Sequence, residues 1–172
     1  MQAVVVREFG PLGTAAIEDV PTPAPGDGEL LVEIAAVAAN FVDTLVMEGK
    51  YQFLPERPFS PGKLPVGTVS AAGKGVAGFK PGDRVLTMAE HGGYAQIVCA
   101  AHDQCQLLLD EMSFDDAAAI AGAYDTAWVA LVDRVRVQAG ETGSVLRELG
   151  GAGLAASHHT RANGARVRRG VS

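Results

Sequence analysis

The sequence is poor in cysteine and in basic residues, and it has no long apolar run. The spacing of its two cysteines, Cys99 and Cys105, matches neither a zinc ribbon nor a redox CxxC motif, so we expect both to pack as small apolar side chains. No apolar stretch approaches the roughly 18 residues that span a bilayer. Arg7 and Glu8 interrupt the N-terminus too early for a signal peptide. We therefore expect a cytoplasmic protein without a membrane segment.

The shortage of basic residues gives a net charge of −6, which argues against nucleic acid as a partner. Residues 1–141 carry nine Lys and Arg against nineteen Asp and Glu, whereas residues 142–172 carry five Arg against Glu148 alone. The composition therefore changes character near Thr142. A basic end of this kind could bind an acidic surface, but a disordered or poorly packed end is the simpler interpretation.

The residues that are abundant favour a mostly β architecture. With 172 residues, 48% of them apolar, the chain can bury the core of one domain, or of one domain and part of a second. The 21 glycines and nine prolines are typical of a turn-rich protein. Short strand-like patterns occur at residues 1–7, 29–35 and 67–72. Another strand is expected after the glycine-punctuated turns of residues 73–85, and residues 91–98 have the pattern of a turn followed by a strand. Their close spacing predicts a small, partly open β-barrel.

Helical patterns are fewer and lie in two places. Residues 41–49 follow Asn40, a favoured N-cap residue. Ser113 and Asp116 have the spacing of a capping box before an alanine-rich run, and residues 126–134 form a further helical pattern. The change from strands to helices near residue 113 predicts a boundary between a β domain and a following segment.

Six motifs in a fixed order carry a resemblance to a known family. They are NFVDT at residues 40–44, PFSPG at 58–62, GFKPGDRV at 78–85, GGYA at 92–95, AYDTA at 123–127 and QAGET at 138–142. In this order they resemble the medium-chain dehydrogenases/reductases, and in particular the zinc-free NADPH:quinone oxidoreductases similar to zeta-crystallin. The resemblance covers residues 1–142 well and residues 143–172 poorly.

The resemblance implies a fold and an activity. The expected fold is mostly β with an α/β start: a GroES-like, partly open β-barrel catalytic domain at residues 1–112, linking helices at 113–141 and an incomplete Rossmann domain at 142–172. The expected activity is hydride transfer from NADPH to a quinone or similar conjugated carbonyl. Preference for NADPH over NADH is implied by the family alone. Family members commonly form homodimers through the nucleotide-binding domain.

The metal-ligand positions of zinc-dependent relatives are filled by other residue types. Asn40 stands where a cysteine is expected, and Gly62-Lys63-Leu64 stands where Gly-His-Glu is expected. Asparagine, lysine and leucine cannot replace thiolate, imidazole and carboxylate ligands of Zn²⁺. We therefore expect no metal, and carbonyl activation by hydrogen bonds instead. Lys63 is itself a departure, because family members usually have Glu just after the Pro-Gly pair.

The resemblance suggests which residues form the site. Asn40 and Tyr51 are the catalytic candidates, because an amide or a phenol can donate to a substrate or nicotinamide oxygen. Thr126 resembles a cofactor contact, although the neighbouring Asp125 would repel a pyrophosphate unless it points away. Two alternatives stay open: Asn40 could serve only as a helix cap, and Tyr51 could be ordinary packing. Asp43 is interpreted as a structural hydrogen-bond acceptor, and Tyr94 as a core or interface aromatic.

The cluster formed by Gly150, Gly151 and Gly153 has the composition of a turn that admits a dinucleotide pyrophosphate at a helix N-terminus. The residues on either side of this cluster fit a dinucleotide-binding motif poorly. Arg147 falls where the first glycine of the motif is expected, and residues 157–163 offer a helix almost nothing apolar to bury. Residues 164–167 have the pattern of a turn into a second strand, which Arg168 interrupts. A damaged or misread coding segment would give this pattern.

Three functional interpretations follow. The first is a zinc-independent quinone reductase, with doubtful activity for this chain alone. The second is a non-catalytic, truncated GroES-like domain or the product of an incorrect gene model. The third is an enoyl or enone reductase of the same superfamily, with the same chemistry and a different small-molecule substrate.

Overall fold

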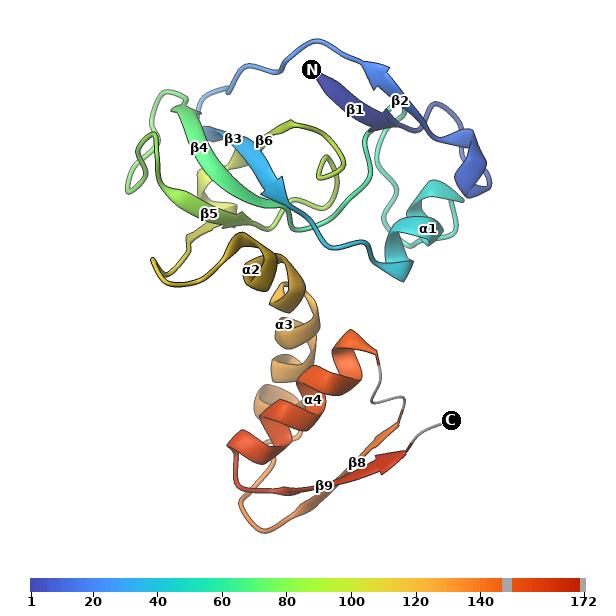
Figure 1. The fold of residues 1–172 in the computed structure, drawn as a ribbon, viewed down its shortest axis with the longest axis vertical. Coiled ribbons are helices and arrows are strands. Elements are labelled where there is room, and N and C mark those ends of the chain that lie inside the picture. The colour runs from blue at the N-terminus through green and yellow to red at the C-terminus, as the bar shows by residue number, and fades with distance from the viewer. Residues whose placement is uncertain (147–149, 171–172) are drawn as a thin grey trace. The chain divides into compact units, whose positions relative to one another are not determined.

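The computed structural model describes residues 1–146 and 150–170, which form two compact units, Met1–Ala118 and Ala119–Ser172 (Figure 1). The prediction that Arg147 replaces the first glycine of the motif concerns a residue outside the described ones. The predicted domain limits at residues 112 and 141 remain a prediction.

The first unit is built on an antiparallel sheet of five strands in the order β6-β3-β4-β5-β7. These strands are β3 (Glu29–Ala36), β4 (Val66–Ala72), β5 (Arg84–Thr87), β6 (Ile97–Ala101) and β7 (Cys105–Leu107). A separate pair, β1 (Gln2–Val5) and β2 (Ala16–Asp19), is joined to the rest by bridges from Ala3 to Ala95 and from Val6 to Phe59. In the described part of the chain, the two edge strands β6 and β7 are not hydrogen-bonded to each other. The predicted partly open barrel is therefore an open sheet.

One of the buried apolar clusters of this unit is built from alternate residues of the sheet. Leu30 and Val32 on β3 are fully buried, whereas Glu33 faces solvent. Val69, Val85 and Val98 from the neighbouring strands pack against them. A glycine is required at Gly67, because a Cβ atom there would lie 2.0 Å from the carbonyl oxygen of Glu33 on the paired strand. Thr87 is also fully buried, and its hydroxyl donates to the carbonyl oxygen of Pro65 at 3.1 Å.

Helical segments of the first unit include η1 (Leu12–Thr14), α1 (Phe41–Met47) and η2 (His102–Gln104), and α2 (Phe114–Ile120) begins in it and ends two residues beyond Ala118. The predicted cap at Ser113 is confirmed, because its hydroxyl oxygen accepts a hydrogen bond from the Asp116 N–H at 3.0 Å. The turn at residues 80–84 is structural, with the Lys80 N–H donating to the Asp83 carboxylate at 2.9 Å. There the Arg84 guanidinium donates to the carbonyl oxygens of Leu109, Asp110 and Met112.

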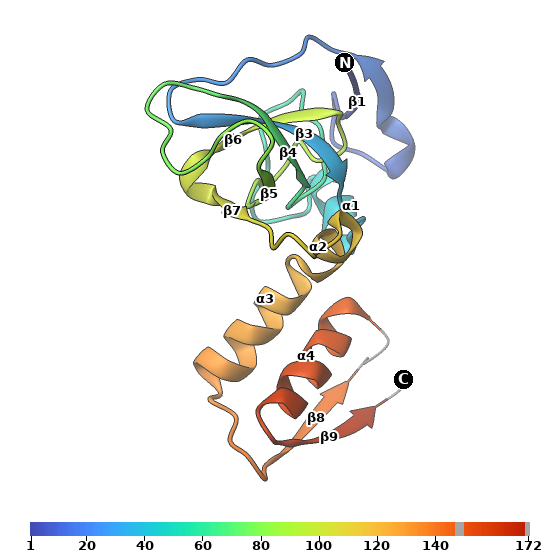
Figure 2. The ribbon, with the colours of Figure 1, turned by 60° about the vertical axis from the view of Figure 1, so that its left-hand side comes forward.

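The second unit contains a single βαβ arrangement. Its elements are α3 (Ala123–Trp128), the π-helical segment η3 (Val129–Arg134), β8 (Thr142–Leu146), α4 (Gly151–Ala162) and β9 (Arg166–Gly170). β8 and β9 are parallel, with Thr142 opposite Arg166, and α4 lies beside them (Figure 2). The polar residues 157–162 thus belong to a helix despite their shortage of apolar side chains. The expectation that Arg168 interrupts the second strand was wrong, because β9 continues through it.

Helix α4 forms because its buried residues are small. Ala155, Ser157 and Thr160 are fully buried, although the hydroxyls of Ser157 and Thr160 have no hydrogen-bond partner among the described residues. The Thr160 side chain lies against Gly143 of β8, where an added Cβ would be 3.3 Å from its methyl carbon. A close approach of helix and strand thus replaces the apolar side chains that the sequence lacks. No helix among the described residues is long and apolar enough to cross a membrane.

Candidate active site

Asn40 is exposed at the start of α1, with extended backbone angles of −116° and 150°. Its backbone N–H donates to the Asp43 carboxylate at 2.9 Å. Its side-chain amide donates to the carbonyl oxygen of Ala38 at 3.2 Å. Asp43, three residues into the helix, thus holds the backbone of Asn40 in place. The Asn40 amide stands at the surface, where it can meet a ligand.

The Asp43 carboxylate is the centre of a buried hydrogen-bond network. Its side chain is buried, and the same oxygen that accepts from Asn40 also accepts from the Tyr94 hydroxyl at 2.8 Å. Burial, and then this hydrogen bond, raise the pKa of Tyr94, so its proton stays in place. Asp43 is a structural acceptor, as expected. The partnership with Tyr94, 51 residues away, is not visible in the sequence.

Two glycine motifs hold Tyr94 in position. The Gly93 N–H donates to the Gly62 carbonyl at 2.9 Å, and the Tyr94 N–H donates to the Pro61 carbonyl at 2.8 Å. Gly62 has a φ of 92°, and a Cβ atom there would lie 2.7 Å from the backbone nitrogen of Tyr94. Three of the six sequence motifs therefore meet at one place and fix the entry to α1.

Tyr51 belongs to a separate set of contacts. Its ring packs on the cluster of Val6, Val46, Met47 and Phe59. Above it, the Lys63 ammonium lies 4.8 Å from the ring centroid, within cation–π range. The ring is therefore packed and also carries a cation, and the catalytic role of Tyr51 stays a prediction.

Lys63 lines a hollow of about 440 Å³ together with residues 52–55, Glu90 and His91. Lys63 and Glu90, which both line it, form an ion pair. Because the residue at 63 was noted only as a departure from the family pattern, its place beside Tyr51 was missed. The hollow lies within the first unit, and Lys63 links its wall to the Tyr51 ring.

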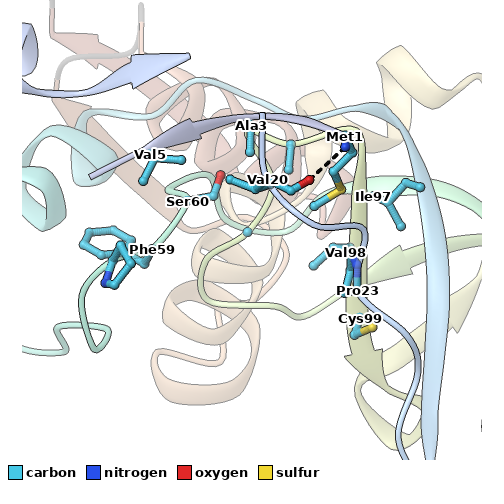
Figure 3. Close-up of a pocket in the computed structure, with 13 residues that line it drawn as sticks. Met1, Ala3, Val5, Val20, Pro23, Phe59, Ser60, Ile97, Val98 and Cys99 are labelled. Carbon is cyan, nitrogen blue, oxygen red and sulfur yellow. Dashed lines mark hydrogen bonds between the residues drawn. The ribbon is translucent and has the colours of Figure 1, made fainter. Parts of the chain in front are cut away.

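A second pocket, of about 230 Å³, is lined mostly by apolar side chains (Figure 3). It is bounded by Ala3 and Val5 of β1 and by Ile97 and Cys99 of β6, and contains none of the predicted site residues. At its rim the N-terminal ammonium of Met1 donates to a backbone carbonyl at 2.8 Å.

The predicted cofactor residues lie in the second unit. Gly150 is the N-cap of α4, and Gly151 begins the helix at a point where a Cβ would be 3.6 Å from the Ala123 side chain of α3. Thr126 and Asp125 are exposed on α3. The first N–H groups of a helix have no partner within it, so this end of α4 can receive an anionic group. Asn40 and Tyr51 are in the other unit.

An aromatic and histidine cluster beside these residues was not foreseen. The Tyr124 hydroxyl lies 2.6 Å from His158 Nδ1, and His159 Nε2 donates to the Tyr124 carbonyl oxygen at 3.2 Å. The rings of Trp128 and His159 pack edge-to-face, with their centroids 5.5 Å apart. The two histidines therefore attach α4 to α3, which gives the polar helix its packing.

The cysteines take no part in this chemistry. Cys105 is buried in the sheet core, which confirms its predicted role, and burial raises the pKa of its thiol to about 11. Cys99 is half-buried, and burial raises the pKa of its thiol too. Within the described part of the chain, no three His, Cys, Asp or Glu side chains gather closely enough to hold a metal ion.

Comparison with known families identifies the chain. Residues 26–136 match the alcohol dehydrogenase GroES-like domain. The chain belongs to this family. A quinone oxidoreductase of Sus scrofa is 37% identical over 169 residues, which are 97% of this chain and 51% of the relative. The predicted resemblance to quinone oxidoreductases of the medium-chain superfamily is confirmed.

Solved structures give the same result. Human synaptic vesicle membrane protein VAT-1 homolog-like protein matches with a TM-score of 0.93 and 32% identity, over 98% of this chain and 55% of that one. The mycobacterial protein Rv1454c, solved in complex with NADPH, matches with a TM-score of 0.91 and 33% identity, over 100% of this chain and 53% of that one. The GroES-like and Rossmann fold class is thus confirmed. The chain spans about half the length of the relatives it matches.

Proposed function

We propose that the chain contributes the substrate side of a zinc-independent oxidoreductase that transfers a hydride from NADPH to a quinone or a similar conjugated carbonyl. The observation that carries the proposal is the junction of three motifs around Asp43, which presents the Asn40 amide at the start of α1. Relatives named quinone oxidoreductase support the choice of substrate class. A structural relative in complex with NADPH supports the choice of cofactor.

In this proposal the residues of the first unit bind and polarise the acceptor. Asn40 donates to the carbonyl oxygen on which negative charge develops, and Asp43 keeps the backbone of Asn40 in position. Tyr51 supplies a ring face to the quinone, with its hydroxyl as a second donor. The bound nicotinamide supplies the hydride itself.

The second unit would hold part of the cofactor. Gly150, Gly151 and Gly153 are at the N-terminus of α4, where the absence of side chains lets a pyrophosphate approach the helix N–H groups, and Thr126 lies on the adjoining α3. The described residues supply one βαβ unit, whereas a dinucleotide site is built from two βαβαβ halves. We therefore expect the chain alone to show no NADPH-dependent turnover.

The test uses a length-restored protein, in which this chain is continued by the second half of the Sus scrofa relative. NADPH consumption is followed with 1,4-naphthoquinone as acceptor, and the chain alone serves as the blank. We expect Asn40→Ala to lower kcat/KM at least about tenfold, since a donor to a developing oxyanion is lost. Asn163→Ala, which removes the only other asparagine, should leave turnover unchanged. Equal kinetics for Asn40→Ala and the parent would reduce Asn40 to a structural residue.

A further inference from the structure

The Lys63 side chain is an unusually fixed cation at the wall of the 440 Å³ hollow. Only 12% of it is exposed, and its ammonium is held over the Tyr51 ring at 4.8 Å. The neighbouring residues 52–55 complete the wall with a mixture of amide, aromatic and aliphatic groups. A volume of this size lies in the range of small-molecule sites.

The ion-pair partner of Lys63 is held much less firmly. The Glu90 side chain is 65% exposed, so it can turn into solvent at little cost, whereas the Lys63 ammonium cannot leave the wall as easily. If a ligand oxygen replaces the Glu90 carboxylate, a charge-assisted hydrogen bond forms in a partly water-excluded place. His91, also on the wall, adds a second group that can donate to an anion.

We propose that this hollow selects acceptors that carry an ionised oxygen, with Lys63 as the specificity-determining residue and Glu90 as a carboxylate that the ligand displaces. The chemical class is a hydroxyquinone anion or another conjugated carbonyl with an acidic substituent. The inference rests on the proposed function for the identity of the acceptor. It goes beyond that function in assigning a charge preference.

The charge at position 63 decides this preference. A carboxylate there, next to Glu90, would make the wall doubly negative and repel an anionic ligand. Lysine reverses that sign and also binds Glu90 when no ligand is present. No cationic side chain lines the apolar pocket of Figure 3. Its one cation is the N-terminal ammonium at the rim, which is already bonded to a backbone carbonyl, so we expect this pocket to take neutral ligands.

The test measures binding to the chain itself, without NADPH. Calorimetric titration compares 2-hydroxy-1,4-naphthoquinone, an anion at neutral pH, with neutral 1,4-naphthoquinone. We expect the anion to bind at least about tenfold more tightly, as one charge-assisted contact provides. Lys63→Met should abolish the difference, and Lys63→Arg should retain it. Lys50→Met is the matched control, because Lys50 is a solvent-exposed lysine paired with Glu48, and it should change nothing.

Glu90→Gln is a second, independent arm, since this exposed side chain can be changed without disturbing the core. It should tighten binding of the anion several-fold, because the ligand no longer has to displace a carboxylate. Equal affinity for the two quinones, or a Glu90→Gln protein with unchanged affinity for the anion, would overturn the inference. Failure of the proposed function would appear differently, as anion-selective binding to a length-restored protein that consumes no NADPH.

Discussion

The two compact units bury polar groups in opposite ways. In the first, Asp43 and Thr87 are buried and their oxygens are hydrogen-bonded. In the second, Ser157 and Thr160 are equally buried, but their hydroxyls have no partner among the described residues. A buried polar group without a partner costs about 1–3 kcal/mol. These buried polar groups are therefore hydrogen-bonded in the first unit, whereas in the second the two hydroxyls lower its stability.

The apolar side chains buried in the first unit are also larger than those buried in the second. Leucine and valine side chains from four strands fill the core of the first unit, whereas the second relies on small side chains and close helix–strand contact. Trp128, the only tryptophan, lies in the second unit against His159 of α4, so its fluorescence reports on that unit alone. This allows the units to be followed separately.

The largest effect is expected from Leu30→Ala in the sheet core. Leu30 is fully buried, so its truncation should lower the free energy of unfolding of the first unit by about 2–5 kcal/mol. Hydrogen exchange at the β3 and β4 amides measures this. Leu154→Ala on α4 is the control: its side chain is 47% exposed, and it should cost far less. Similar losses at the two leucines would remove the contrast between the units.

Asp43→Ala tests the polar interior of the first unit. Two donors, the Tyr94 hydroxyl and the Asn40 N–H, lose their acceptor, so we expect a loss of about 3 kcal/mol. Tyr94→Phe removes one donor and leaves Asp43 bound to Asn40, which should cost about 1 kcal/mol. Both values come from urea unfolding followed by circular dichroism. If Tyr94→Phe costs as much as Asp43→Ala, the carboxylate is not the centre of the network.

Removing buried polar groups from the second unit should raise its stability, the opposite of the effect in the first. Ser157→Ala combined with Thr160→Val removes two buried hydroxyls that have no hydrogen-bond partner in the described part of the chain, and should raise the free energy of unfolding by about 2 kcal/mol. The midpoint of urea unfolding, read from Trp128 fluorescence, should move upward. Ser144→Ala, at an exposed position on β8, should leave it unchanged. A fall in the midpoint for the double variant would mean that these hydroxyls are bonded in solution.

The smallest expected effect is a loss of stability of the first unit at alkaline pH. Burial raises the pKa of Cys105 from its ordinary value of 9.0 to about 11. The contribution of the protonated thiol is therefore complete below pH 9 and is lost as pH rises to 11, because the unfolded chain ionises first. The loss should be on the order of 1 kcal/mol. Cys105→Ala should flatten this part of the pH profile, and an unchanged slope would assign it to other groups.

Much of the fold could be predicted because its patterns are local. The alternation around Glu33 predicted β3, and the Ser113 cap predicted α2. The strand β7 was missed because it has three residues, of which only Cys105 is buried. The sequence also suggested that α4 had nothing to bury. That inference counted apolar side chains and overlooked that small ones suffice where Gly143 lets the helix come close.

The site was less predictable, because it depends on contacts between distant residues. Asn40 and Tyr51 were chosen as candidates by resemblance, and their roles remain proposals. The Asp43–Tyr94 hydrogen bond links residues that no local pattern connects. Likewise, the Lys63–Glu90 pair unites two separate turns. Such pairs become visible only when the sheet has brought their segments together.

The arginines of β9 also bear on solubility. Among the described residues, β8 and β9 pair only with each other, so each offers one strand edge to other molecules. Arg166 and Arg168 are exposed along that strand, and like charges on neighbouring copies oppose stacking of such edges. The same guanidinium groups that fit a buried Rossmann strand poorly therefore place like charges along β9. Their protection weakens as added salt screens the repulsion.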